Sequence, residues 1–496
     1  MTIIGKVKEF FAKISQRYAA AKDYPFAHFP SGRGYTDENR EVADSWTAVT
    51  GRTQQLVRDF PPFASAVNNL VAYQAGDGFR FQSLARLPDG TPDRDSAQQI
   101  EEAFIAWQHD CDESGTLSFM EMQQLWRRQI LETGDAIIRK YVNDRGRLKL
   151  KVMNPASLGF GLSRTNNPVF MGIEYDQATM KRLRYWFFPT SSTASALEQF
   201  QTDATSIPAD EILHGFDTKS PDQMRGISPF ASAILLCSMA RDYMQAELAT
   251  QQIHSKFTAF VTTPSVGQGS QWDKAEYDRV MKGYSEQIKY GTMEFLRPGQ
   301  TITLNNVQRS ATGVKDFLEM VLRMVAASSG CTYQMVAENY TGLNYTVTKS
   351  SMNSFKQRLK VVHSSTITRL LRPTFVQWLD LEHLSGRMNL PYYWSRRSSY
   401  LRHKWIPPGI ESVDPMKDAQ AAQVMIEAGL MSPQEAIMSQ GRDPDMVISE
   451  LAEWKQQLKE AKITELWMAG LAQTLPKVNP TAKTTQTLDN DEVENG

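Results

Sequence analysis

The chain has 496 residues, and its 54 Lys and Arg against 55 Asp and Glu leave a formal net charge of -1 at pH 7. This length exceeds what one hydrophobic core usually spans, so we expect two or more structural regions. The near-neutral charge argues against a dedicated, tight binder of nucleic acid, because phosphate contacts require clustered cations.

The three cysteines, Cys111, Cys237 and Cys331, lie far apart and form no CxxC pair. Neither a disulfide framework nor a zinc knuckle is indicated, and a reducing cytoplasm fits best. The first 22 residues place apolar side chains on one helix face with basic residues between them, which favours a packing helix over a membrane-surface helix or a targeting segment. The sequence has no long uncharged apolar run, so we expect a soluble protein without a membrane span.

Residues 1–227 mix helical and strand patterns, which predicts an α+β fold class for this region. Helical periodicity occurs at 97–109 and 119–133, and β-rich runs occur at 148–153 and 184–189.

The pattern changes at Ser228-Pro229, where a capping Ser and a Pro at the first helical position predict a helix that runs to His254. Such a helix would be roughly 40 Å long. Its charged residues are few and its apolar residues occur on more than one face, so we expect it to pack against several neighbours, including other subunits.

The next hundred residues alternate between short elements and helices. Strand-like runs and short helices are predicted first, then a helix, a loop and a second long helix that Pro373 kinks or ends. The predicted ranges are strands at 257–263, 293–296 and 301–304, helices at 273–289 and 313–328, a loop at 330–346 and a helix from 347. The loop is rich in Gly, Asn, Thr and Tyr, and a loop of this length inside a compact protein is often functional.

The C-terminal part reads as a chain of capped helices from 411 to 474. Ser432-Pro433 with Glu435 predicts a capping box, and Asp443-Pro444 predicts the start of the next helix. The polar residues from Pro476 onward predict a disordered tail.

The segment 110–121 fits the spacing of an EF-hand calcium loop. Oxygen-bearing side chains fall at its first, third, fifth, seventh, ninth and twelfth places, and Gly115 stands at the sharp turn. The candidate ligands are Asp110, Asp112, Ser114, Thr116, Ser118 and Glu121. The competing interpretation is a turn that only caps the two flanking helices, because EF-hands normally work in pairs and this sequence has one copy.

The search for catalytic motifs is negative. The seven histidines form no HExxH or HxH pair, and the sequence contains no GxSxG elbow and no GxxxxGK[ST] loop. The run 159–164 starts like a dinucleotide loop but has Arg164 where the last glycine should stand. We therefore expect a protein that is not an enzyme.

Several segments between about residues 45 and 470 share the pattern of one known family. The most telling is IPADEILHGFDTKSPDQMRGISPFASAI (207–234), and the runs at 51–83, 293–302 and 414–444 add to it. Together they resemble the lambda family of phage portal proteins. Thr346 stands where that family usually has Ser, and Lys349 where Arg is frequent.

This resemblance implies a portal fold with an α/β wing, long stem helices, a small α/β clip, a tunnel loop and a helical crown. The implied parts are the wing at 1–227 and 384–410, stem helices at 228–254 and 313–329, the clip at 255–312, the tunnel loop at 330–346, a wing-crossing helix at 347–383, the crown at 411–475 and a disordered tail at 476–496.

In such a fold the tunnel loop would face DNA in the channel. The residues implied for that role are Tyr333, Gln334, Glu338, Asn339, Tyr340, Asn344, Tyr345 and Lys349. The loop is mostly neutral, so it can touch DNA without trapping phosphates.

The resemblance also implies the assembly and its partners. It implies a dodecameric ring at the portal vertex of the virion, assembled in the cytoplasm of the bacterial host, for DNA packaging and ejection. The implied partners are the terminase large subunit, which would supply ATP hydrolysis, the head-tail adaptor, the major capsid and scaffold proteins, and double-stranded DNA bound without sequence specificity. No cofactor is required. The alternative hypothesis is a calcium-binding structural or regulatory protein built around 110–121.

Overall fold

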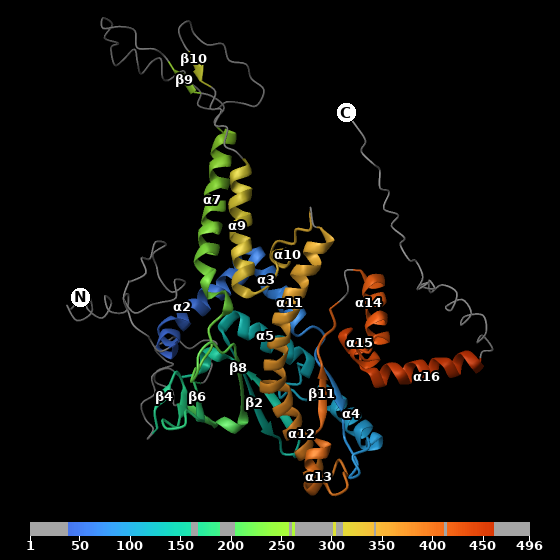
Figure 1. Ribbon diagram of the computed structural model, residues 1–496. Coiled ribbons are helices and arrows are strands. Elements are labelled where there is room, and N and C mark those ends of the chain that lie inside the picture. The colour runs from blue at the N-terminus through green and yellow to red at the C-terminus, as the bar shows by residue number, and fades with distance from the viewer. Residues whose placement is uncertain are drawn as a thin grey trace, which may run out of the picture. The chain divides into compact units, whose positions relative to one another are not determined.

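The structure is a computed structural model that describes residues 38–159, 167–188, 204–256, 260–262, 301–303, 311–341, 344–410 and 414–460. The chain divides into two units, one made of residues 1–79 and 83–402 and the other of residues 80–82 and 403–496. Helices and small antiparallel sheets both occur (Figure 1), so the predicted α+β class is confirmed.

The first half of the larger unit combines helices with two antiparallel sheets. Its helices are α2 (Glu38–Asp59), α3 (Pro61–Gln74), α4 (Arg94–His109) and α5 (Phe119–Thr133). Its strands are β2 (Asp135–Val142), β3 (Leu148–Met153), β4 (Val169–Phe170), β5 (Ile173–Tyr175), β6 (Arg182–Phe187), β7 (Thr205–Pro208) and β8 (Ile212–Phe216). The helices predicted at 97–109 and 119–133 and the strands predicted at 148–153 and 184–189 are confirmed within a few residues.

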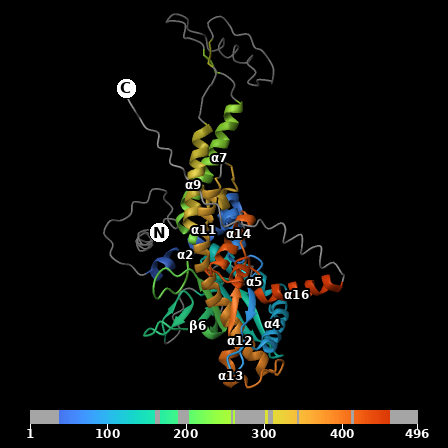
Figure 2. The same ribbon diagram turned by 45° about the vertical axis from the view of Figure 1, so that its right-hand side comes forward.

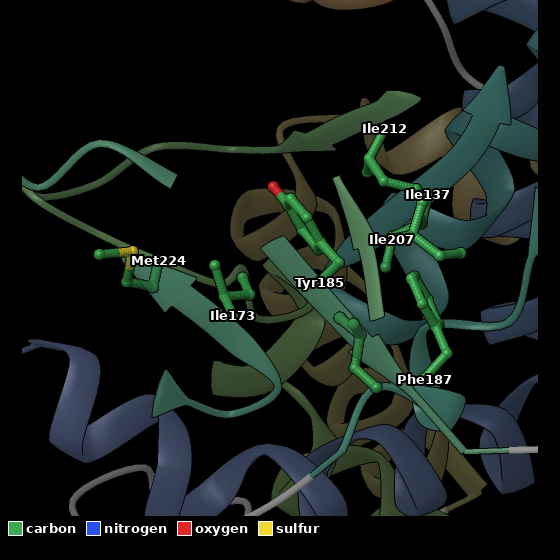
Figure 3. Packing of buried hydrophobic residues seen from close by; sticks show 8 residues of the cluster. Ile137, Ile173, Tyr185, Phe187, Ile207, Ile212 and Met224 are labelled. Carbon is green, nitrogen blue, oxygen red and sulfur yellow. The ribbon is translucent and has the colours of Figure 1, made fainter. Parts of the chain in front are cut away.

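The two sheets have the strand orders β3-β2-β8 and β4-β5-β6-β7. Apolar side chains from both sheets meet in one buried cluster (Figure 3), which also includes residues of the connecting segments. The cluster consists of Ile137, Leu158, Ile173, Tyr185, Phe187, Ile207, Ile212 and Met224. Because its members come from strands of both sheets, this core holds the two sheets together.

Two long helices, α7 (Ile234–Lys256) and α9 (Ala311–Ser329), lie side by side (Figures 1 and 2). The prediction that Ser228 and Pro229 start α7 is wrong. Ser228 caps, and Pro229 begins, the short 3-10 helix η4 (Pro229–Ser232) that precedes α7. The helix predicted at 313–328 is confirmed. Between them β9 (Phe260–Thr262) pairs with β10 (Thr301–Thr303), so strands predicted at 257–263 and 301–304 are confirmed in part. The predictions for 273–289 and 293–296 lie outside the described residues.

Pro373 does not end the second predicted long helix. The helix α11 (Tyr345–Thr366) continues through a π-helical turn, η5 (Ile367–Leu371), into α12 (Arg372–Leu384). Proline lacks an N–H donor and crowds the carbonyl four residues before it, and the wider turn accommodates both effects. The larger unit closes with α13 (Tyr393–Tyr400).

The smaller unit contains a two-stranded sheet of β1 (Arg80–Ser83) and β11 (His403–Ile406). Its helices are α14 (Pro415–Glu427), α15 (Pro433–Ser439) and α16 (Pro444–Glu460). The predicted capping box of Ser432 and Glu435 is confirmed. Residues 461–474 and the predicted tail from Pro476 lie outside the described residues.

Candidate functional site

The polar segment 330–346 is not one continuous loop, which corrects the prediction. Residues Tyr333–Ala337 form a short helix, α10, which ends at Glu338 with a left-handed φ of 49°. Met335 and Val336 are buried, and α10 packs against α3 and α9. A five-residue helix is too short to show helical periodicity, so the sequence pattern could not reveal it.

The end of the segment also differs from the prediction, because α11 begins at Tyr345. The side chain of Asn344 caps this helix, with its Oδ1 accepting a hydrogen bond from the Thr346 N–H at 3.0 Å. Asn344, Tyr345 and Lys349 therefore belong to a helix and its cap. The described residues between α10 and α11 are 338–341 and 344.

The structure brings together only part of the predicted set of site residues. Tyr340 is 62% exposed, and its hydroxyl lies 3.5 Å from Glu338 Oε2. The side chain of Asn339 accepts a hydrogen bond from the Thr341 hydroxyl at 2.7 Å. Tyr333 and Gln334 are instead part of α10, and the Tyr333 ring packs under the guanidinium group of Arg323 at 5.5 Å.

The paired helices α7 and α9 leave large apolar side chains exposed. Tyr243 and Phe317 make an edge-to-face contact between the two helices, with ring centroids 4.9 Å apart. The exposed side chains are Tyr243, Met244 and Leu248 of α7 and Met320 and Met324 of α9. An exposed group of this kind on a helix pair is typical of an interface with another chain.

In the predicted calcium loop, each carboxylate is held by protein donors. Asp110 forms an ion pair with Lys149 at 2.9 Å. Asp112 accepts hydrogen bonds from Ser114 and from the backbone N–H groups of Thr116 and Leu117, the latter two at 3.0 and 3.1 Å. Burial opposes ionisation of Asp112, yet these hydrogen bonds lower its pKa below the usual value.

The end of this loop has a clear structural function. Ser118 caps α5, and the carboxylate of Glu121 accepts a hydrogen bond from the Ser118 N–H at 2.7 Å, which completes a capping box. No three His, Cys, Asp or Glu side chains among the described residues, which include all of 110–121, are grouped to hold a metal ion. This arrangement favours the capping interpretation, and calcium binding stays a hypothesis.

A buried cluster of charged and polar groups lies at the base of the long helices, and sequence reasoning missed it. Asp135, the first residue of β2, is fully buried. Its Oδ2 accepts a hydrogen bond from Arg225 Nε at 2.7 Å, and its Oδ1 accepts one from the Gly226 N–H at 2.5 Å and one from His214 Nε2 at 3.2 Å. The signal in the sequence is His214, in a strand (212–216) whose other residues are apolar.

The contacts of His214 determine its charge. Burial lowers its pKa to about 4, and Arg182 adds to this effect, while the hydrogen bond with Asp135 acts in the opposite direction. His214 is therefore neutral near pH 7, with Nε2–H donating to Asp135 and Nδ1 accepting from the Tyr185 hydroxyl at 3.2 Å. Burial alone would raise the pKa of Asp135, but Arg225 and His214 bring it below the usual value.

This cluster fixes the segment that leads into α7. Gly226 packs so closely on Gly134 that an added Cβ would lie 2.1 Å from the Gly134 carbonyl oxygen. The hydroxyl of Ser228 donates a hydrogen bond to the Leu131 carbonyl at 2.6 Å. The base of the long helix pair is thus tied to α5 and β2.

No helix among the described residues is both long enough and apolar enough to cross a membrane.

A family model and two named relatives are similar to this chain in sequence. The family model described as phage portal protein, lambda family, matches residues 32–363. A probable portal protein of Halomonas phage phiHAP-1 is 26% identical over 384 residues, which cover 76% of this chain and 73% of that protein. Portal protein B of Escherichia phage lambda is 23% identical over 260 residues, and that match spans about half of each chain, 47% and 48%.

Solved structures are also similar. A chain in the neck of a native gene transfer agent particle, computed with C12 symmetry, matches with a TM-score of 0.48 and 15% identity, covering 79% of this chain and 94% of that chain. An HK97-family phage portal protein from Corynebacterium diphtheriae matches with a TM-score of 0.36 and 11% identity, covering 69% of this chain and 99% of that one. Since the family model covers well over half of the sequence, the chain belongs to the lambda family of phage portal proteins.

Proposed function

We propose that this chain is one subunit of a twelve-membered ring at the portal vertex of the virion, through which DNA is packaged and ejected. Portal proteins are structural components of the virion and not enzymes. The proposal goes beyond family membership in three respects: the number of subunits, the path of the DNA and the partners.

The exposed apolar surface of the α7–α9 pair is the observation that supports ring formation. Leu248 is 60% exposed and Met320 45%, although both side chains lie on helices that already pack against each other. Burying such a surface against a different surface of the next copy gives a head-to-tail contact, and repeated contacts of this type close into a ring.

The structural elements then correspond to the parts of a portal. We assign the sheets and their helices within 1–227, together with 384–410, to the wing, α7 and α9 to the stem, 255–312 to the clip, 347–383 to the wing-crossing helix, and α14, α15 and α16 within 411–475 to the crown. The smaller unit gives a second, independent argument for assembly. Its helices α14 and α15 contain no buried residue. Helices of this length are marginal alone and usually require packing partners.

The residues after α10 are the proposed contact with DNA. Asn339 and Tyr340 are neutral and polar, so they can touch the passing duplex without holding its phosphates by charge. The conduit itself requires no cofactor, because ATP hydrolysis would come from a terminase docked at the clip. The head-tail adaptor and the major capsid and scaffold proteins are the other proposed partners.

The test separates assembly from DNA passage. Purified protein is imaged by negative stain, and we expect rings with a central hole. A variant in which Asn339 and Tyr340 are both changed to Asp should still form rings, but should package little DNA in a complementation assay, because added negative charge repels phosphates. Protein that stays monomeric at high concentration would argue against the ring, and normal packaging by the Asp variant would argue against this DNA path.

A further inference from the structure

One face of α3 carries polar side chains spaced by four residues, Ser65, Asn69 and Tyr73. Residues with this spacing lie one above the other on a helix. The same face packs against α10, which lies more than 250 residues later in the chain. The face is therefore positioned to hold the polar segment.

The contacts between α3 and the end of α10 are hydrogen bonds. The Asn69 amide nitrogen lies 2.7 Å from the Met335 carbonyl oxygen and 2.7 Å from Glu338 Oε1, so its two hydrogens can serve both acceptors. The Ser65 hydroxyl lies 3.1 Å from the same carbonyl and 3.0 Å from the same carboxylate oxygen. Two side chains of α3 thus share two acceptors.

These contacts satisfy groups that α10 cannot satisfy itself. The last carbonyls of any helix have no partner within the helix, and a helix of five residues consists almost entirely of such ends. The carbonyl of Met335 is one of them. External donors to this carbonyl therefore stabilise α10.

We propose that Ser65 and Asn69 are positioning residues that cap α10 and hold the Glu338 carboxylate, and so fix the position of Asn339 and Tyr340 for contact with DNA. The part that concerns DNA rests on the proposed function of the segment. The hydrogen bonds from Asn69 and Ser65 also lower the pKa of Glu338, which keeps the anchoring carboxylate ionised.

The test uses amide hydrogen exchange of the assembled full-length protein, followed in peptides that cover 331–341. Asn69→Ala should raise exchange in α10 about tenfold, the factor that corresponds to loss of roughly one to two hydrogen bonds. Asn68→Ala is the matched control, because Asn68 directly precedes Asn69 in the same helix and accepts a hydrogen bond from Arg128 instead. The control should exchange like the wild type.

Glu338 provides a second pair of variants. Glu338→Gln keeps an acceptor oxygen and should retain protection, whereas Glu338→Ala should lose it; Ser65→Ala gives a milder loss. Exchange that is unchanged in Asn69→Ala, or equally raised in Asn68→Ala, would overturn the positioning role.

Packaging efficiency is measured on the same variants. Raised exchange with wild-type packaging would leave the positioning role intact and contradict only the DNA path proposed above.

Discussion

At the scale of single residues, Asp135 combines complete burial with three separate hydrogen-bond donors. Asp135→Ala would leave Arg225 buried without its carboxylate partner. Removing one member of a buried ion pair typically costs about 3–5 kcal/mol, so we expect a large fall in the midpoint of thermal unfolding.

Asp110→Ala is the matched control for this variant. Its carboxylate pairs with Lys149 but is 60% exposed, and exposed ion pairs contribute about 1 kcal/mol or less. Calorimetric unfolding of both variants gives the comparison. Similar small losses in the two would mean that Arg225 finds another partner when Asp135 is removed.

His214 makes stability depend on pH. Its pKa is about 4 in the folded chain against an ordinary value of 6.5, so between these values the unfolded chain binds a proton that the folded chain does not. Stability should therefore fall as the pH falls from about 6.5 to about 4, by up to roughly 3 kcal/mol from this residue.

Burial also lowers the pKa of His363 to about 4, so it should add to the same trend. Chemical denaturation of the wild type at several pH values across this window measures the slope. His214→Gln should reduce the slope because the side chain no longer titrates. A slope equal to that of the wild type would show that His214 is not the residue responsible.

At the scale of elements, the pattern of oxygen-bearing side chains in the loop between α4 and α5 fits both a calcium loop and a turn that caps α5. Asp112→Ala should lower stability by about 1–3 kcal/mol, because the backbone N–H groups of Thr116 and Leu117 lose a charged acceptor. Thermal unfolding without calcium measures this loss.

Calorimetry with calcium distinguishes the two interpretations of the loop. We expect the loop only to cap the helix. Wild type and Glu121→Ala should then give the same heat when calcium is added. A heat present in the wild type and absent from Glu121→Ala would instead support a calcium site at 110–121.

Elements with a repeated pattern could be predicted from the sequence, and those defined by distant partners could not. The strand 148–153 and the helix 119–133 match the structure residue for residue, since each has a clear apolar period and breakers at its ends. The α-helix predicted from Ser228 starts instead at Ile234, because Ser228 caps a 3-10 turn that is tied to α5.

The candidate site shows the same limit. The sequence identified the polar segment as unusual, but α10 packs on α3 and receives hydrogen bonds from Ser65 and Asn69, which lie far away in the sequence. Likewise, no local sequence pattern predicts the hydrogen bond between Asp135 and Arg225, which lies 90 residues later. Contacts between distant residues determine the details that matter for function.

At the scale of the whole molecule, the proposed ring requires the apolar surface of α7 and α9 to be covered by the next copy. Leu248→Lys places a charge in the exposed surface of α7, and burying an unpaired charge at an interface is strongly unfavourable. We expect this variant to fold but to remain largely unassembled, as measured by sedimentation and negative-stain images.

The control is Ile105→Lys on α4, since Ile105 is 50% exposed and Leu248 is 60% exposed. A charge there should leave ring formation unchanged, because α4 lies outside the α7–α9 pair. If both variants form rings, the α7–α9 surface is not a subunit contact; if only Ile105→Lys fails, the contact lies on α4 instead. A ring lost only in Leu248→Lys would show that the apolar residues of α7 form the subunit contact of the proposed ring.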